Sequence, residues 1–137
     1  MIEETHQIPP QISQVRFVVA NVIDVLAAAG LSPSDCFDVK SALTEALTNA
    51  IKFGTDPGGA AGHLWYRLDG HRLIIRVTDR GPGFDWDAYP DPTSPENLLA
   101  EGGRGVFLIK HLMDRTTYDR ATRTLTMEKN LSRPRGV

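Results

Sequence analysis

Apolar side chains recur at helical spacing in the first part of the chain. From Ser13 they follow one another at steps of three and four residues, which predicts an amphipathic helix that ends near Gly30. A second stripe follows N-cap candidates at residues 32–35 and predicts a helix that ends at Gly54. The stripes consist of Val15, Val18, Val19, Val22, Ile23, Leu26 and Ala27, and of Val39, Leu43, Ala46, Leu47, Ala50 and Ile51. Residues 3–12 are polar and contain two prolines, so a short edge strand or an extended lead-in is expected there.

The second half of the chain combines β-rich runs with one short helical run. Residues 63–78 are rich in β-forming side chains on both sides of Asp69-Gly70, a pair that two-residue hairpin turns prefer. They predict two antiparallel strands. Helical spacing returns over residues 106–113, and residues 116–120 and 122–130 alternate as a closing pair of strands.

Glycine and proline mark the segments between these elements. Residues 54–62 contain five of them, which predicts a connecting loop. Residues 79–105 contain so many that a long loop is expected, and long loops in compact domains are usually functional. The tail over residues 132–137 is expected to fray.

Length, composition and net charge indicate a single globular domain and disfavour some binding partners. The chain has 137 residues, which fits a single domain over residues 1–137. Hydrophobic residues make up 41% and charged residues 23%, as in an ordinary globular chain. The 15 Lys and Arg residues against 17 Asp and Glu residues leave a net charge of -2, which disfavours direct binding to nucleic acid or to acidic lipid.

Cysteine content and the first residues indicate a compartment. Cys36 is the single cysteine, so an internal disulfide or a Cys-x-x-Cys metal site is impossible, as suits a reducing environment. The first residues lack the basic start and apolar run of a signal peptide, and no apolar stretch approaches the roughly 18 residues of a membrane span. A cytoplasmic protein without membrane contact is expected.

The second predicted helix carries a carboxylate and an amide at helical spacing. Glu45 and Asn49 are four residues apart and therefore share one helix face, roughly opposite to Leu43, Leu47 and Ala50. Such a pair could polarise a nucleophile and coordinate a hard cation such as Mg²⁺ through oxygen. The alternative is a solvated surface, where most pairs of this kind lie.

Two further segments could bind a ligand. Asp79 directly follows a predicted strand and could accept a hydrogen bond from a ligand amine, while Gly81 and Gly83 would let the backbone approach a flat ring; a simple turn is the alternative. Glycine-rich residues 101–105 lead into a helix, whose N-terminal N–H groups suit phosphates; a flexible lid is the alternative. A P-loop and a Rossmann fingerprint are both absent from the sequence, which excludes conventional proteins of those two classes.

The three segments together resemble the N, G1 and G2 boxes of the GHKL superfamily of ATPases and kinases. They read Glu-x-x-x-Asn on a helix, Asp-x-Gly-x-Gly after a strand and Gly-x-Gly before a helix. Residues 41–54 and 102–114 are most similar to the N box and the G2 box of the bacterial anti-sigma factor serine kinases of sporulation and general stress control. The resemblance implies an α/β sandwich, of the Bergerat type, with helices on one face of a mixed, mostly antiparallel sheet.

The resemblance also implies roles for individual residues. Asn49 would be the Mg²⁺ ligand that bridges the metal to the phosphates of ATP, and Glu45 would be the general base. Asp79 would accept a hydrogen bond from the adenine amino group. The rest of the nucleotide site would be formed by Gly81 and Gly83 around the base, by Gly103, Arg104 and Gly105 around the phosphates, and by Thr124 in support of the adenine site.

The function implied is that of an ATP-dependent serine/threonine protein kinase that regulates transcription by binding proteins. In this family the kinase binds an RNA polymerase sigma factor, and it phosphorylates an antagonist with a STAS fold; homodimers are common. Two alternatives remain open at this point. One is a nucleotide-binding partner-switch protein without kinase activity, and the other is a kinase that acts in a sensory complex and not on a sigma factor.

Overall fold

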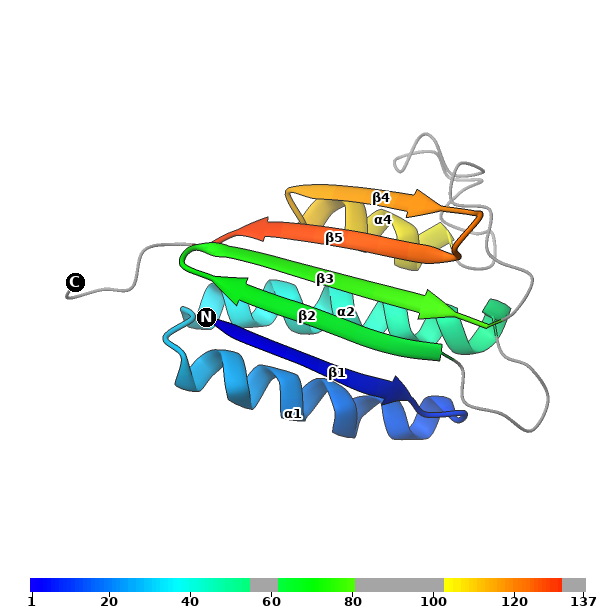
Figure 1. Cartoon of the computed structure of the whole chain (residues 1–137), viewed down its shortest axis with the longest axis horizontal. Coiled ribbons are helices and arrows are strands. Elements are labelled where there is room, and N and C mark those ends of the chain that lie inside the picture. Colours follow the sequence, from blue (N-terminus) through cyan, green and yellow to red (C-terminus); the bar gives the residue numbers. More distant parts are fainter. Residues whose placement is uncertain (55–61, 81–102, 132–137) are drawn as a thin grey trace.

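The computed structural model describes residues 1–54, 62–80 and 103–131. Within these ranges, five strands, three α-helices and one 3-10 turn follow one another, and Figure 1 shows how they are arranged. Their bounds, in chain order, are β1 Ile2–Ile8, η1 Ile12–Gln14, α1 Val15–Ala28, α2 Pro33–Gly54, β2 Gly62–Asp69, β3 Arg72–Asp79, α4 Gly103–Leu112, β4 Arg115–Asp119 and β5 Thr124–Asn130. Among the described residues, none of the helices is both long enough and apolar enough to span a membrane.

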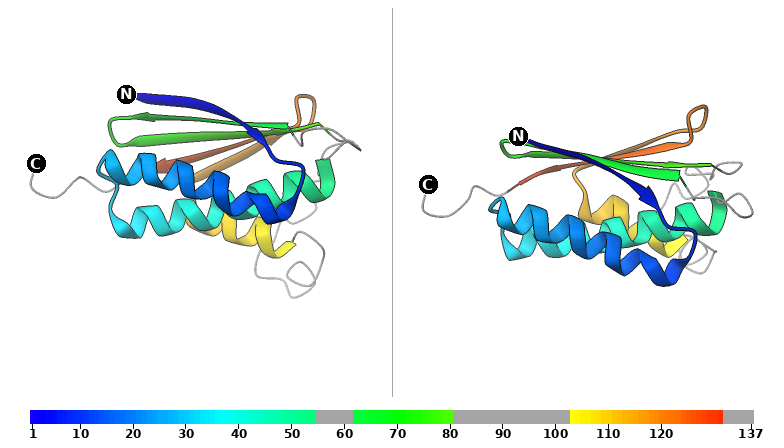
Figure 2. Two further views of the ribbon diagram at one scale, coloured as in Figure 1. Left: turned by 90° about the horizontal axis from the view of Figure 1, so that it is seen from below. Right: turned by 60° about the horizontal axis from the view of Figure 1, so that its bottom comes forward.

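The strands form one sheet in the order β1-β2-β3-β5-β4. All three helices lie against the same face of this sheet (Figure 2). Side chains alternate along each strand, and the inward ones on β2 and β3 are buried and mostly apolar. The two-layer α/β sandwich is therefore confirmed. The sheet that was expected to be mixed is antiparallel at every described pairing.

Helix α2 is the central helix of the helical layer. It contacts α1 on one side, α4 on the other and β3 above. Its own apolar side chains are buried in the core, including Leu43 and Leu47 at 0% exposure. A helix that is packed on several sides can direct polar side chains into an interface between elements, and α2 does so toward α4.

The first hairpin and the first helix have boundaries that differ from the predictions. Asp69 pairs with Arg72, so the hairpin turn consists of Gly70 and His71, one residue later than predicted. Gly70 has φ +61° at the first turn position, where a type II′ turn needs glycine. The first helix starts at Val15 because a 3-10 turn precedes it.

The closing hairpin has a longer loop than its alternation suggested. Asp119 pairs with Thr124, so the strands stop earlier and start later than residues 120 and 122. One oxygen of Asp119 accepts hydrogen bonds from the backbone N–H groups of Ala121 at 2.9 Å and Thr122 at 3.3 Å. Such a local carboxylate turn withdraws these residues from the strand ladder.

The polar lead-in is a regular edge strand over Ile2–Ile8. The long loop was expected over residues 79–105. Helix α4 begins at Gly103, so this prediction is wrong for residues 103–105. The loop expected over residues 54–62 is wrong at its two ends, because Gly54 ends α2 and Gly62 begins β2. Residues 55–61, most of the long loop and the expected frayed tail lie outside the described residues.

Candidate functional site

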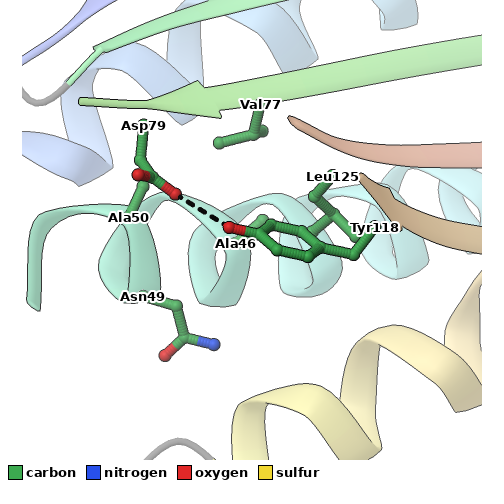
Figure 3. A pocket seen from close by; sticks show the side chains of 7 residues that line it. All are labelled: Ala46, Asn49, Ala50, Val77, Asp79, Tyr118 and Leu125. Atoms are coloured by element: carbon green, nitrogen blue, oxygen red, sulfur yellow. Dashed lines mark hydrogen bonds between the residues drawn. The ribbon is translucent and has the colours of Figure 1, made fainter. Parts of the chain in front are cut away.

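A pocket lies at the C-terminal end of β3, between the sheet and α2 (Figure 3). Its polar groups come from Asn49, Asp79 and Tyr118. The remainder of the described lining is apolar and consists of Ala46, Ala50, Val77 and Leu125. An apolar cavity with a few placed polar groups is typical of a small-molecule site.

Asp79 presents a carboxylate to this pocket from the last position of β3. The residue is 6% exposed, and the hydroxyl of Tyr118 donates to its Oδ2 at 3.4 Å (Figure 3). The backbone N–H of Asp79 donates to the carbonyl of Arg123 at 3.1 Å, which fixes the strand end. Buried carboxylates are favourable only where donors surround them, so an amine of a bound ligand suits this position.

The backbone beside Asp79 is closely packed at Gly62. Gly62 pairs with Asp79 across β2 and β3 and has φ +137°. A Cβ on Gly62 would lie 1.8 Å from the carbonyl oxygen of Thr78. Any larger residue would therefore push β2 away from the strand end that carries Asp79. Sequence reasoning missed this role, because glycine content alone placed Gly62 in a loop.

Glu45 and Asn49 lie against the first turn of α4. A Cβ on Gly105 would lie 2.7 Å from Oε2 of Glu45 and 3.2 Å from Nδ2 of Asn49. Asn49 is 9% exposed and Glu45 is half-buried, so the pair is not a fully solvated one. Asn49 also lines the same pocket as Ala50. Figure 3 nevertheless shows Asn49 on the side of α2 that faces away from Asp79, whereas Ala50 lies on the side toward it.

The remaining glycine-rich candidates fall on two segments. Gly103 and Arg104 begin α4, where the first backbone N–H groups have no partner within the helix and can bind an anion. Gly105 completes this first turn and brings it next to Glu45. Gly81 and Gly83 lie outside the described residues.

Thr124 does not line the pocket. Leu125 lines the pocket, and neighbouring residues of a strand point to opposite faces. The hydroxyl of Thr124 lies 2.9 Å from that of Thr78, across the β3–β5 pair on the other face of the sheet. This contact joins the strand that ends in Asp79 to its neighbour.

Tyr118 is a site residue that sequence reasoning missed. It contributes both a ring to the pocket wall and a donor to Asp79. The sequence hinted at this role only through the alternation of the predicted closing strand, which placed Tyr118 on one face of that strand. The partner, 39 residues earlier, could not be inferred from spacing.

The donor set fits a hard cation that is shared with a phosphate ligand. The described part of the chain holds no cluster of three or more His, Cys, Asp or Glu side chains that could form a metal cage. Mg²⁺ is usually held by one or two protein oxygens together with substrate phosphates and water. The amide oxygen of Asn49, beside the carboxylate of Glu45 and the first turn of α4, meets this requirement.

Comparison with known proteins places the chain in a family. The sequence pattern of the histidine kinase-like ATPase domain matches residues 8–129. The serine-protein kinase RsbW of Staphylococcus epidermidis is 32% identical over 136 residues, which cover 93% of this chain and 86% of that protein. The RsbW of Halalkalibacterium halodurans is 39% identical over 107 residues, which cover 74% of this chain and 64% of that protein.

A solved structure shares the fold. The crystal structure of the RsbU and RsbW domains of Rv1364c from Mycobacterium tuberculosis matches 98% of this chain and 34% of that chain, with a TM-score of 0.72 and 21% identity. The resemblance that the three sequence motifs indicated is therefore confirmed. The chain belongs to the histidine kinase-like ATPase domain family, within the group of the RsbW serine-protein kinases.

Proposed function

We propose that this chain is an ATP-dependent protein serine/threonine kinase that also binds a sigma factor. One observation carries the proposal. Asn49 lines the pocket that contains Asp79, and the same Asn49 lies with Glu45 against the first turn of α4. The pocket that would bind the base and the helix start that would bind the phosphates therefore meet at one amide side chain.

The nucleotide would lie along this line. Asp79 would accept a hydrogen bond from the adenine amino group, and the apolar walls at Val77 and Leu125 would cover the ring. The phosphates would lie at the start of α4, where backbone N–H groups and the positive end of the helix favour anions. Thr124 would act indirectly, through Thr78 and the strand end.

Glu45 and Asn49 would divide the chemistry between them. Asn49 would hold Mg²⁺, and the bound ion would neutralise charge on the phosphates. Glu45 would accept the proton of the incoming serine or threonine hydroxyl. The hydroxyl oxygen would bond to the γ-phosphorus, while the bond between the γ-phosphorus and the bridging oxygen breaks and ADP leaves. Because phosphoryl transfer depends mainly on position and charge, Asn49 should matter for binding and Glu45 for transfer.

The partners follow from the relatives. An RsbW-like kinase would phosphorylate an anti-anti-sigma protein of STAS fold and would alternatively hold a sigma factor, and we expect it to act as a homodimer in the cytoplasm. The net charge of -2 agrees with a regulator that binds proteins and leaves DNA to its partner.

The decisive experiment incubates the protein with labelled ATP, Mg²⁺ and its STAS partner. Wild type should label the partner. Glu45→Gln should keep ATP affinity and lose labelling, and Asn49→Ala should lose Mg²⁺-ATP binding itself. Asn21→Ala removes an exposed amide from α1 and is the matched control for binding.

Each result separates the alternatives. A wild type that binds ATP without labelling the partner would be a nucleotide-responsive binder and not a kinase. Labelling without capture of a sigma factor in a pull-down would favour a kinase of a sensory complex. Unchanged Mg²⁺-ATP affinity in Asn49→Ala would refute the role of that residue.

A further inference from the structure

A buried lysine lies at the end of α4 that is far from the pocket. Lys129, on β5, is 7% exposed. Its ammonium lies 3.2 Å from Oδ2 of Asp38 on α2 and donates to the carbonyl of Leu112, the last residue of α4, at 3.0 Å. A buried charge is costly unless it is paired and hydrogen-bonded, and here one cation joins three elements.

The chain that follows α4 is attached to the same strand by two further bonds. The N–H of Asp114 donates to the carbonyl of Glu128 at 2.9 Å. The carboxylate of Asp114 accepts a hydrogen bond from the N–H of Asn130 at 2.6 Å. The C-terminal end of α4 is therefore held against β5 on both sides of Lys129.

At the N-terminal end of α4 there is little space between the helix and α2. Gly105 is so close to Glu45 and Asn49 that a single added carbon would lie 2.7 Å from Oε2 of Glu45. Gly105 and Leu112 are separated by about 10 Å of continuous helix, at roughly 1.5 Å per residue. A helix transmits displacement along its axis, so a shift at Leu112 moves the turn that faces Glu45.

We propose that Lys129, together with Asp38, is a positioning residue that sets where the first turn of α4 lies over Glu45 and Asn49. The inference rests on the proposed function, because that turn is where the phosphates would bind. Lys129 acts through the helix: among the described residues it does not line the pocket, and the atoms nearest to a Cβ on Gly105 belong to Glu45 and Asn49. None of the described residues of α4 lines the pocket, so the base-binding end should be insensitive to Lys129.

The test compares two ligands that share a base but differ in phosphates. Affinities for Mg²⁺-ADP and for adenosine are measured by calorimetry on wild type and on Lys129→Met, at a temperature well below the unfolding transition. ADP affinity should fall roughly five- to twentyfold, while adenosine affinity stays within about twofold. A purely structural lysine would lower both affinities together or neither of them.

Three variants sharpen the result. Lys129→Arg keeps the charge and should restore much of the ADP affinity. Gly105→Ala perturbs the same contact directly and should also lower ADP affinity without affecting adenosine. Lys40→Met removes an exposed lysine from α2 and should change neither affinity.

Asp38→Asn removes only the partner carboxylate and carries the test if Lys129→Met does not fold. It should lower ADP affinity in the same selective way, by a smaller factor. Equal losses for both ligands, or no loss in either folded variant, would overturn the positioning role while leaving the proposed kinase intact. A wild type that binds neither ligand would overturn the proposed function and this inference with it.

Discussion

Two tyrosine–carboxylate pairs lie on the helix-facing side of the sheet, and they differ in which partner is buried. At the β1 edge, the hydroxyl of Tyr66 donates to Glu4. Tyr66 is 0% exposed, whereas the side chain of Glu4 is 39% exposed. At the pocket, Tyr118 donates to Asp79 at 3.4 Å, and there the carboxylate is the buried partner at 6%.

The edge pair is completed by neighbouring groups of the chain. Nε2 of His6 lies 3.2 Å from the same oxygen of Glu4, and the His6 ring stacks on Tyr66 at 6.2 Å. The hydrogen bond from Tyr66, and then the contact with His6, lower the pKa of Glu4. Burial, and then Glu4, raise the pKa of Tyr66. The pair therefore links the edge strand β1 to β2 and leaves its charged group partly exposed to solvent.

The pocket pair places its charged group inside an apolar cavity. Hydrogen-bond donors stabilise a carboxylate in such a cavity, and a ligand amine would be a further donor. The same two residue types thus serve a structural role where the phenol is buried and a binding role where the carboxylate is buried. Substitutions at the two pairs should separate nucleotide affinity from fold stability.

The largest effect is expected at Asp79. Asp79→Asn keeps the shape of the side chain but removes its charge, and a hydrogen bond to a charged group contributes about 1.5–3 kcal/mol. ATP affinity should fall roughly tenfold to a hundredfold in calorimetric titration, since each 1.4 kcal/mol is a factor of ten. Glu4→Gln is the matched control at the edge pair. An equal loss in Glu4→Gln would remove the distinction between the two pairs.

A smaller effect is expected at the tyrosines. Tyr118→Phe keeps the ring and removes the donor to Asp79, so ATP affinity should fall about twofold to tenfold, as for a neutral hydrogen bond. Tyr66→Phe should leave ATP affinity unchanged and lower the free energy of unfolding by about 1 kcal/mol, measured by urea denaturation. A nucleotide defect in Tyr66→Phe, or none in Tyr118→Phe, would contradict the assignment.

Sequence reasoning reached what depends on neighbours along the chain. Helical spacing was sufficient to place Glu45 and Asn49 on one face, and β-rich runs around Asp69-Gly70 were sufficient to predict the hairpin. The position of the turn was wrong by one residue, because strand pairing and not turn preference placed Gly70 and His71 in it.

Contacts between distant residues could not be predicted. Nothing in the alternation of β5 indicates that Lys129 meets Asp38 on the second helix, and nothing in the spacing pairs Tyr118 with Asp79. Glycine content predicted a loop up to residue 105, whereas Gly105 is helical and lacks a side chain because Glu45 occupies the space. Glycine required by packing looks, in a sequence, like glycine required by flexibility.

The smallest expected effect concerns pH and is confined to the edge pair. The folded state lowers the pKa of Glu4, so the charged carboxylate stabilises the fold above its unfolded pKa, near 4.5, and this contribution is lost as the pH falls through the folded value. Because Glu4 is more than a third exposed, solvent screening should keep the contribution below about 1 kcal/mol. Wild type should exceed Glu4→Gln in unfolding free energy at pH 7, and in urea titrations this difference should shrink as the pH falls below 4.5. A difference that is the same at every pH would show that the amide disturbs packing and that the charge of Glu4 contributes nothing.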